Sequence, residues 1–312
     1  MPYKKKVTIL SAAAVLLALV YLLTLFFDPQ RASARAASFT WLSSSARDLA
    51  DGMDIIRNGQ TLKLVLSNGI WFAQLENLEV PVKQGRIDDL FRLLSTRGAF
   101  PRRGSSAASH EGLGLGEGAS RLLVRGGAGL PLLDLFVGKD DPSGREVFLR
   151  KAGENEFRSG DKLIASYVNG EKTSWFDMKF FDEKSLNLVQ RVDVQFNGYT
   201  GGEDPPEVYS DYTLERSGEN WLVGNAAVDR EKTETWLRSL LEAQGENILP
   251  PVPFDILAKI TLGLGDGSVL SLQIGAPGED GKYPALVNGK NYMFVLSPWM
   301  VTRLLRDRGS FF

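Results

Sequence analysis

The sequence predicts an α+β protein, in which an N-terminal transmembrane helix precedes two repeated modules of mostly antiparallel sheet with helices packed on one face. Three observations lead to this prediction. The chain opens with a long uncharged run, two blocks of sequence recur in the same order, and short alternating apolar runs are joined by turn residues and followed by amphipathic helices. Together they indicate one membrane-bound segment and a body built from two similar parts.

The uncharged run extends from Val7 to Phe27 and follows three lysines, Lys4 to Lys6. A helix rises about 1.5 Å per residue and must cover roughly 30 Å of hydrocarbon, so this run is long enough to span a lipid bilayer once. Because the lysines precede the run, the positive-inside rule places residues 1–6 in the cytoplasm and the chain after residue 27 outside it. We therefore expect a transmembrane helix at residues 7–27 and a linker at residues 28–40.

A cleaved secretory signal is the alternative interpretation of this run. Ala32-Ser33-Ala34 and Ala34-Arg35-Ala36 resemble the small-residue sites at which signal peptidases cut. The apolar core of a signal peptide spans about 7–15 residues, and this run is longer, which favours the retained anchor. Both interpretations place the body of the protein outside the cytoplasm. The chain contains no Cys, which excludes a lipoprotein anchor, disulfides and thiolate chemistry.

Composition limits the classes of function. The formal net charge is −2, and acidic and basic residues are interspersed, so there is no basic patch of the kind that binds nucleic acid. The hydrophobic share of 43% is sufficient for a buried core. We expect a globular body with no nucleic-acid partner.

An internal repeat predicts the domain organisation. Residues 53–59 (MDIIRNG) align with residues 192–198 (VDVQFNG), and residues 133–138 (LDLFVG) align with residues 270–275 (LSLQIG). Between these blocks each half has a Trp, then a Val, then an amphipathic helix. The common order predicts a first module at residues 41–171, a connector at residues 172–180 and a second module at residues 181–312.

Strands and turns are predicted from alternation. Thr61–Leu66 and Asp211–Arg216 have the period of half-buried strands. Further strands are expected at residues 132–137, 147–149, 270–274, 285–287 and 292–296. Positive-φ turn residues join the runs, which predicts tight hairpins and mostly antiparallel sheets. These turns are Asn58-Gly59, Asn68-Gly69, Ser217-Gly218 and Asp266-Gly267.

Four helices are predicted from apolar spacing. Arg86–Leu94 and Asp229–Ala243 each present an apolar stripe, and Asp161–Val168 and Pro298–Asp307 close the two halves. Ser297 is a suitable N-cap, and Pro298 is a favourable first helical residue.

The ordered set of motifs resembles the bacterial domain-of-unknown-function 4340 family. The residues that carry the resemblance are Trp221, Val228-Asp229, Leu237, Leu240, Leu241, Gly114-Leu115, Leu122-Leu123-Val124, Val137-Gly138 and Ile274-Gly275. The first half departs from the pattern, because Lys83 replaces the acid at the helix start and Gly118-Ala119 stands where Pro is common. The resemblance implies an inner-membrane protein with a periplasmic body, which acts beside ABC-transporter or gliding-motility-type subunits; it implies no catalytic residues.

Two candidate sites lie in one Ser/Gly-rich stretch. His110 is the sole histidine, and we interpret it as a solvated loop residue because nothing nearby supplies a nucleophile elbow. Gly112–Gly118 resembles a phosphate loop, but a strand follows it and no Lys-Ser or Lys-Thr closes it. We therefore interpret it as a flexible connector. With one His and no Cys, a transition-metal site is not expected.

Paired acids have structural interpretations. Asp140-Asp141-Pro142-Ser143-Gly144 lacks the spaced acids of a calcium loop and is typical of a hairpin turn. Asp88-Asp89 lies beside Arg86 and Arg92 on a predicted helix, as expected of a charged surface.

Aromatic residues are numerous. Because Trp71 and Trp221 occupy equivalent places, a packing role is simpler than a sugar-binding groove. The stretch Thr173–Phe181 is denser in aromatics; we interpret it as a wedge between the modules, with an exposed partner-binding patch as the alternative.

No constellation in the sequence predicts catalysis, and we expect no catalytic, cofactor-binding or metal-binding residue and no cofactor. The expected function is a non-enzymatic accessory or scaffold protein of the envelope that binds membrane protein partners, transporter subunits among them. The alternatives are an envelope ligand-binding module and a cell-wall hydrolase that works through carboxylates.

Overall fold

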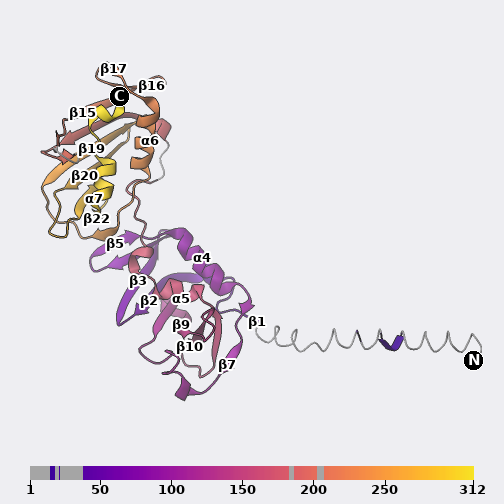
Figure 1. Ribbon diagram of the computed structural model, residues 1–312. Coiled ribbons are helices and arrows are strands. Elements are labelled where there is room, and N and C mark those ends of the chain that lie inside the picture. Colours follow the sequence, from indigo (N-terminus) through magenta and orange to yellow (C-terminus); the bar gives the residue numbers. More distant parts are fainter. Residues whose placement is uncertain (1–14, 18–20, 22–37, 183–185, 202–206) are drawn as a thin grey trace, which may run out of the picture. The chain divides into compact units, whose positions relative to one another are not determined.

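The computed structural model describes residues 15–17, 21, 38–182, 186–201 and 207–312 (Figure 1). The predicted transmembrane segment Val7–Phe27 lies largely outside these ranges. Within them, no helix has both the length and the apolar composition needed to cross a membrane.

The described chain is mostly β, with two nine-stranded antiparallel sheets and few helices. This confirms the predicted antiparallel sheets, but strands make up more of the described chain, and helices less, than the predicted α+β class implies. The chain divides into two compact units. The first unit comprises residues 1–74 and 83–171, and the second comprises residues 75–82 and 172–312.

The first sheet has the strand order β5-β4-β3-β2-β8-β9-β10-β11-β7. Its strands are β2 (Ala50–Arg57), β3 (Gln60–Ser67), β4 (Ile70–Leu75), β5 (Leu78–Pro81), β7 (Arg102–Gly104), β8 (Ser120–Gly126), β9 (Leu130–Asp140), β10 (Glu146–Lys151) and β11 (Phe157–Asp161). The helices of this part of the chain are α3 (Ala46–Leu49), α4 (Gln84–Ser95) and α5 (Leu163–Asn169). Helix α5 contacts α4 and strands β2, β8 and β9.

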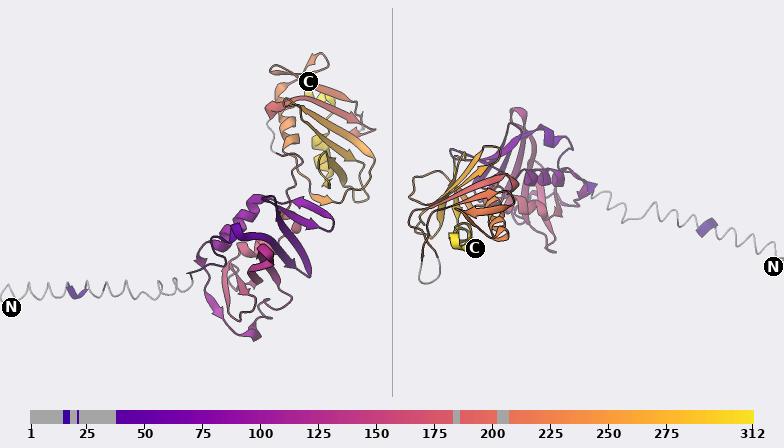
Figure 2. Two further views of the ribbon diagram at one scale, coloured as in Figure 1. Left: turned by 180° about the vertical axis from the view of Figure 1, so that it is seen from behind. Right: turned by 90° about the horizontal axis from the view of Figure 1, so that it is seen from above.

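The second sheet has the strand order β17-β16-β15-β12-β19-β20-β21-β22-β18. Its strands are β12 (Val189–Phe196), β15 (Tyr212–Ser217), β16 (Asn220–Val223), β17 (Ala226–Ala227), β18 (Asn247–Leu249), β19 (Ile256–Leu264), β20 (Val269–Gly275), β21 (Tyr283–Val287) and β22 (Met293–Leu296). Helices α6 (Arg230–Leu241) and α7 (Pro298–Leu304) contact each other, and the 3₁₀ turn η5 (Arg308–Phe311) packs on α6. Figure 2 shows this unit from two further sides.

Two short ribbons complete the strands. Strand β1 (Ser38–Phe39) pairs with β6 (Gly98–Ala99), and β13 (Thr200–Gly201) pairs with β14 (Glu207–Val208).

The predicted turns and helices agree with the structure to within a few residues. Asn58, Gly59, Asn68 and Gly69 all have positive φ, which is the backbone geometry that closes two-residue hairpins. Helix α4 buries Ile87, Leu90, Phe91 and Leu94, the apolar stripe that predicted it. Two closing helices are shorter than predicted. Helix α5 starts at Leu163 because residues up to Asp161 belong to β11, and α7 ends at Leu304 because Leu305 is extended.

The strand orders match position by position. β2, β3, β4, β5, β8, β9, β10, β11 and β7 of the first sheet occupy the places of β12, β15, β16, β17, β19, β20, β21, β22 and β18 in the second. The sequence alignment falls on matching registers, because Ile55, Leu122 and Leu135 lie in one row of the first sheet and Val194, Ile260 and Leu272 in the same row of the second. In both rows every side chain is buried.

The aligned glycines Gly138 and Gly275 have a shared structural reason. A Cβ on Gly138 would lie 2.5 Å from the Leu113 carbonyl oxygen, and a Cβ on Gly275 would lie 2.4 Å from the Phe254 ring. In each unit the chain that crosses from the far edge strand back to the middle of the sheet rests on this glycine. The Val/Ile-Gly motif therefore marks the place where the crossing segment packs against the sheet.

Candidate functional site

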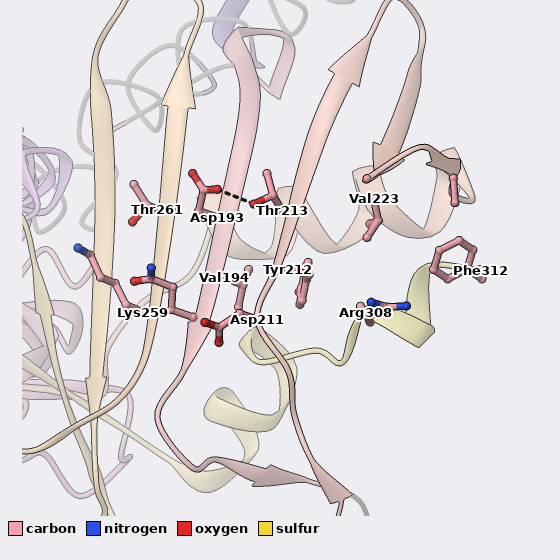
Figure 3. A pocket seen from close by; sticks show the side chains of 13 residues that line it. Asp193, Val194, Asp211, Tyr212, Thr213, Val223, Lys259, Thr261, Arg308 and Phe312 are labelled. Carbon is pink, nitrogen blue, oxygen red and sulfur yellow. Dashed lines mark hydrogen bonds between the residues drawn. The ribbon is translucent and has the colours of Figure 1, made fainter.

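A groove of about 640 Å³ lies on one face of the second sheet (Figure 3). We call it the sheet-face groove. Strands β12, β15 and β19 form its floor, and the β16–β17 turn and η5 with the C-terminal residue contribute its remaining walls. The residues that line it are Asp193, Val194, Gln195, Asp211, Tyr212, Thr213, Val223, Gly224, Ala226, Lys259, Thr261, Arg308 and Phe312.

Strand alternation sends polar side chains into this groove. On β12, Val192 and Val194 are buried in the core, so Asp193 between them points to the opposite face. The register places Asp193 directly between Thr213 on β15 and Thr261 on β19. A carboxylate is thus flanked by two hydroxyls on neighbouring strands.

Asp193 is held by three hydrogen-bond donors from two residues. Arg191 donates from Nη2 to Oδ1 at 2.8 Å and from Nε to Oδ2 at 2.9 Å, and the Thr213 hydroxyl donates to Oδ1 at 2.7 Å. The Arg191 hydrogen bonds lower the pKa of the Asp193 carboxyl; burial opposes this shift, and Thr213 adds to it. Asp193 therefore stays ionised at neutral pH and has no proton to donate as a general acid.

Asp211 and Tyr212 contribute to the groove and to its frame. The Asp211 carboxylate accepts a hydrogen bond from the Phe196 backbone N–H at 2.7 Å, which ties β12 to the start of β15. The Tyr212 ring packs against Phe311 with centroids 5.7 Å apart, and its hydroxyl is buried without a hydrogen-bond partner in the described chain. Burial raises the pKa of Tyr212, so this hydroxyl remains protonated.

Two basic groups in the groove remain available. Neither Lys259 nor Arg308 forms an ion pair with any described residue, whereas Asp193 is already paired with Arg191. Among the described residues that line the groove there is no His, Cys or Ser. The arrangement therefore offers ionic and hydrogen-bonding contacts for a polar partner. The Thr213 hydroxyl donates to Asp193, but the lowered pKa of this carboxyl makes it a weak base.

The first sheet carries an aspartate at the equivalent position, in a different setting. Asp54 on β2 is only 7% exposed and receives two hydrogen bonds from Arg125, at 2.6 and 2.7 Å. Arg125 lies opposite Gly52, whereas in the second sheet Arg191 lies opposite Gly263. Each sheet thus pairs its aspartate with an arginine, but the arginine comes from opposite strands of the equivalent strand pair.

Further arginines cover the same face of the first sheet. Arg121 forms a two-point ion pair with Asp134, and the Arg121 and Arg150 guanidinium groups lie 5.2 and 4.4 Å from the Phe136 ring centroid. Arg150 also donates to the Leu115 carbonyl at 2.7 Å. These contacts fill the face on which the second sheet has its groove.

His110 is not a solvated loop residue, as predicted, but a buried one. It is 8% exposed, its Nε2 lies 3.0 Å from the Asn155 carbonyl oxygen, and its ring meets Phe157 edge-on. The following loop, Gly112–Gly118, buries Leu115 completely and leads into strand β8, as predicted. Burial of His110 and Leu115 anchors this stretch to β9–β11, which the Ser/Gly-rich composition did not suggest.

The paired acids occupy the structural roles expected of them. Asp141 lies in the β9–β10 turn. The pKa of its carboxyl is lowered, chiefly by a hydrogen bond from the Glu146 backbone N–H. Asp89 pairs with Arg92 on helix α4 at 2.5 Å, and Asp88 pairs with Arg47 of helix α3 at 2.9 Å. Among the described residues, no group of His, Cys, Asp and Glu could hold a metal ion.

The aromatic residues serve mainly as core. Trp71 and Trp221 are fully buried at equivalent strand positions, which confirms their predicted packing role, whereas Trp299 is exposed. In the stretch Thr173–Phe181 all five large apolar side chains are buried, so the alternative of an exposed partner-binding patch there is wrong. These side chains are Trp175, Phe176, Met178, Phe180 and Phe181.

One serine–carboxylate contact was not predicted. Ser159 is fully buried on β11, its hydroxyl contacts the Glu146 carboxylate, and Arg103 donates to the same hydroxyl at 2.6 Å. A nucleophile needs access to its substrate, so this buried serine is a structural link between neighbouring strands. These residues lie far apart in sequence, and strand pairing alone brings them together.

Comparison with known proteins gives no relative: no family model, curated protein or solved structure matches this chain.

Proposed function

We propose that this chain is a membrane-anchored, non-enzymatic accessory or scaffold protein of the bacterial envelope. In this proposal Val7–Phe27 spans the inner membrane, and the body lies in the periplasm. The body has two copies of one module, with helices packed on one face of each sheet, and binds membrane protein partners. Subunits of ABC-type transporters or gliding-motility-like complexes are the partner class we expect, as in the domain-of-unknown-function 4340 family that the sequence resembles.

The observation that carries the proposal is that one chain contains both an apolar opening run preceded by lysines and two sheets of matching strand order. Module duplication is supported by the aligned registers, the aligned glycines and the aspartate–arginine pair in each sheet. A non-catalytic role is supported by the sheet-face groove, whose Asp193 has a lowered pKa and is already paired with Arg191, and whose described lining contains no His, Cys or Ser.

The topology can be tested with the full chain fused at Phe312 to a reporter. We expect alkaline phosphatase, which is active only outside the cytoplasm, to be active, and a fluorescent protein that folds only in the cytoplasm to be dark. Deleting residues 1–27 should release the body from the membrane fraction. Mass spectrometry of the membrane-bound chain distinguishes a retained anchor from cleavage near Ala34. A fusion that is active only in the cytoplasm would contradict the proposal.

The partner class is tested by crosslinking in intact membranes, followed by solubilisation and identification of the attached proteins. We expect transporter-type membrane subunits to be attached reproducibly to the full chain. A chain that crosslinks to no membrane protein would exclude the scaffold function even if the topology is as proposed.

An envelope ligand-binding module is the second candidate, and the available Lys259 and Arg308 in the groove favour it. Such a module would bind a small anionic ligand, and Lys259→Ala would weaken that binding. A cell-wall hydrolase would instead require Asp193 or Asp211 as its acid. Asp193→Asn and Asp211→Asn would then abolish cleavage of purified peptidoglycan, whereas we expect no cleavage by the unaltered chain.

A further inference from the structure

The segment between β18 and β19 presents three prolines and two apolar side chains on the surface. Its sequence is Leu249-Pro250-Pro251-Val252-Pro253, which we call the proline segment. Leu249 and Val252 are 42% and 58% exposed, and all three prolines are exposed. Beyond the end of β18 at Leu249, no helix or strand begins until Ile256.

Covalent geometry restricts every residue of the proline segment. Each proline ring holds φ near −65°, and a residue that precedes a proline is driven to extended or polyproline II backbone. Leu249, Pro250 and Val252 all precede a proline. A polyproline II helix has about 3 residues per turn, so in that conformation Leu249 and Val252 would lie on one side and Pro250 and Pro253 on an adjacent one. The spacing of the sequence would then present two apolar-proline pairs to a partner.

Both ends of the proline segment are fixed to the sheet. Leu249 pairs with Met293 at the edge of the second sheet. At the other end, Phe254 packs on Gly275, and the Asp255 carbonyl accepts a hydrogen bond from the Ala276 N–H at 3.1 Å. A segment held at both ends loses little conformational entropy when a partner binds it.

The first unit shows that this crossing does not require exposed apolar side chains. Residues 105–119 make the same connection, from β7 to β8, and they bury Leu115 and His110. The second unit crosses with six residues, 250–255, and leaves Val252 and the prolines in solvent.

We propose that the proline segment is a docking ligand for a partner protein that has a groove lined with aromatic side chains. Such grooves recognise polyproline II segments of the form P-x-x-P, and Pro250 and Pro253 have this spacing. Asp255 follows the segment, is exposed and has no ion pair with any described residue, so the groove should carry a basic residue beside its aromatic ones. This inference rests on the proposed scaffold function and names the kind of partner.

The test uses the full chain in the membranes of the cells that produce it, with a photo-crosslinking amino acid at position 252. The same label at Glu279, in an exposed loop of the same unit, is the control. We expect one protein to be crosslinked from position 252, with the attachment point among aromatic residues. A synthetic peptide of residues 247–256 should reduce this crosslink, and the same peptide with alanine in place of Pro250 and Pro253 should not.

The decisive variant is Pro250→Ala together with Pro253→Ala. We expect it to reduce the crosslinked yield about tenfold, which corresponds to about 1.4 kcal/mol of binding free energy. Pro277→Ala, at another exposed proline of the same unit, should leave the yield unchanged. Circular dichroism of each variant checks that the fold is retained.

Two results would overturn the inference. One is a crosslink from position 252 that the double variant leaves unchanged. The other is attachment from position 252 only to lipid, to a second copy of this chain, to a surface without aromatic residues, or to nothing. If general crosslinking still captures membrane partners, this inference alone has failed. If the phosphatase fusion is inactive and no partner is captured at all, the proposed function has failed.

Discussion

The two units share one strand order but treat the same sheet face differently. In the first unit this face is filled: Asp54 is buried against Arg125, and Phe136 lies between Arg121 and Arg150. In the second unit the equivalent aspartate, Asp193, is half-buried and faces the sheet-face groove. The shared core specifies the topology, and the solvent-side positions of the strands decide whether a unit carries a groove.

The aspartate–arginine pairs show how one arrangement can be reached in two ways. In the first sheet Arg125 extends across Gly52, and a Cβ on Gly52 would lie 3.3 Å from the Arg125 Nε. In the second sheet the residues are exchanged: Arg191 lies opposite Gly263, whose added Cβ would lie 3.6 Å from the Arg191 Cβ. An aspartate on the central strand needs one arginine beside it, and the glycine opposite leaves room for that side chain to cover the strand. A reciprocal exchange at one paired position is what we expect of a duplicated module.

The largest expected effect tests whether the two cores are equivalent. Trp71→Ala and Trp221→Ala each remove a fully buried ring from the same strand position, so each should cost about 3–5 kcal/mol in its own unit. Hydrogen-exchange mass spectrometry of the full chain reports the opening free energy of each unit's peptides separately. Trp299→Ala, at an exposed position, is the control and should change neither unit. Unequal losses for Trp71 and Trp221 would break the comparison.

The two aspartates should differ in their contribution to stability. Asp54→Ala leaves a partly buried arginine without its partner and should destabilise the first unit by about 3 kcal/mol. Asp193→Ala should cost the second unit at most about 1 kcal/mol, because its carboxylate is 33% exposed and Arg191 is 51% exposed. Urea unfolding followed by hydrogen exchange measures both losses.

The pH dependence of the free energy of unfolding at acidic pH provides a second measurement for Asp193. Its pKa is lowered in the folded state, so its contribution is complete above the unfolded pKa, about 3.9, and is lost as pH falls through the folded value. The Asp193→Ala variant should therefore converge with the unaltered chain at low pH. A difference that grows on acidification would contradict the assignment.

Exchanging the arginine and glycine sharpens the comparison further. Arg125→Gly alone should cost the first unit about 2–3 kcal/mol, because Asp54 then lies buried without its partner. Adding Gly52→Arg reproduces the arrangement of the second sheet and should recover most of that loss, a coupling that a double-mutant cycle measures. If the double variant is no more stable than Arg125→Gly, the two pairs are not interchangeable.

Substitution of the aligned glycines Gly138 and Gly275 should cause smaller losses of stability. A second substitution should offset the loss in the second unit but not in the first. Gly138→Ala and Gly275→Ala should each cost about 1–3 kcal/mol through overpacking. In the second unit the nearest obstacle is the Phe254 side chain, so Phe254→Ala should offset much of the Gly275→Ala loss. In the first unit the obstacle is the Leu113 backbone carbonyl, so Leu115→Ala should not rescue Gly138→Ala. Equal rescue in both units would contradict this account of the motif.

The smallest expected effect is at the helix starts. Asp229 caps α6 by accepting from the Lys232 N–H at 3.0 Å, so Asp229→Ala should cost about 1 kcal/mol. Lys83 occupies the equivalent place before α4 and makes no side-chain capping hydrogen bond, so Lys83→Ala should cost less. Thermal unfolding of the full chain, with hydrogen exchange to identify the unit, measures both changes.

Much of the fold could be predicted from short-range patterns. Asn58-Gly59 and Asn68-Gly69 specify tight hairpins because those residues tolerate positive φ, and the Ile87–Leu94 stripe specifies α4 because its spacing matches the helix period. The aligned blocks predicted equivalent strands because each falls on a buried central strand. His110 was misjudged, since its burial depends on Phe157 and Asn155, which lie far away in sequence.

The candidate site depended on contacts that no local pattern contains. The sequence places Asp193 on a strand between two valines, but only strand pairing brings Thr213 and Thr261 beside it and leaves Lys259 and Arg308 available. The proline segment was not singled out from the sequence, because its exposure depends on tertiary contacts such as the packing of Phe254 on Gly275.

The sequence by itself determined the apolar opening run, the hairpin turns, the amphipathic helices and the order of the two halves. All of these depend on composition and on periods of a few residues along the chain. The tertiary structure decided the nine-stranded sheets, the exchanged arginines and the open face of the second sheet. These features depend on which distant strands become neighbours, and that is set by the burial of whole sheets rather than by any local preference.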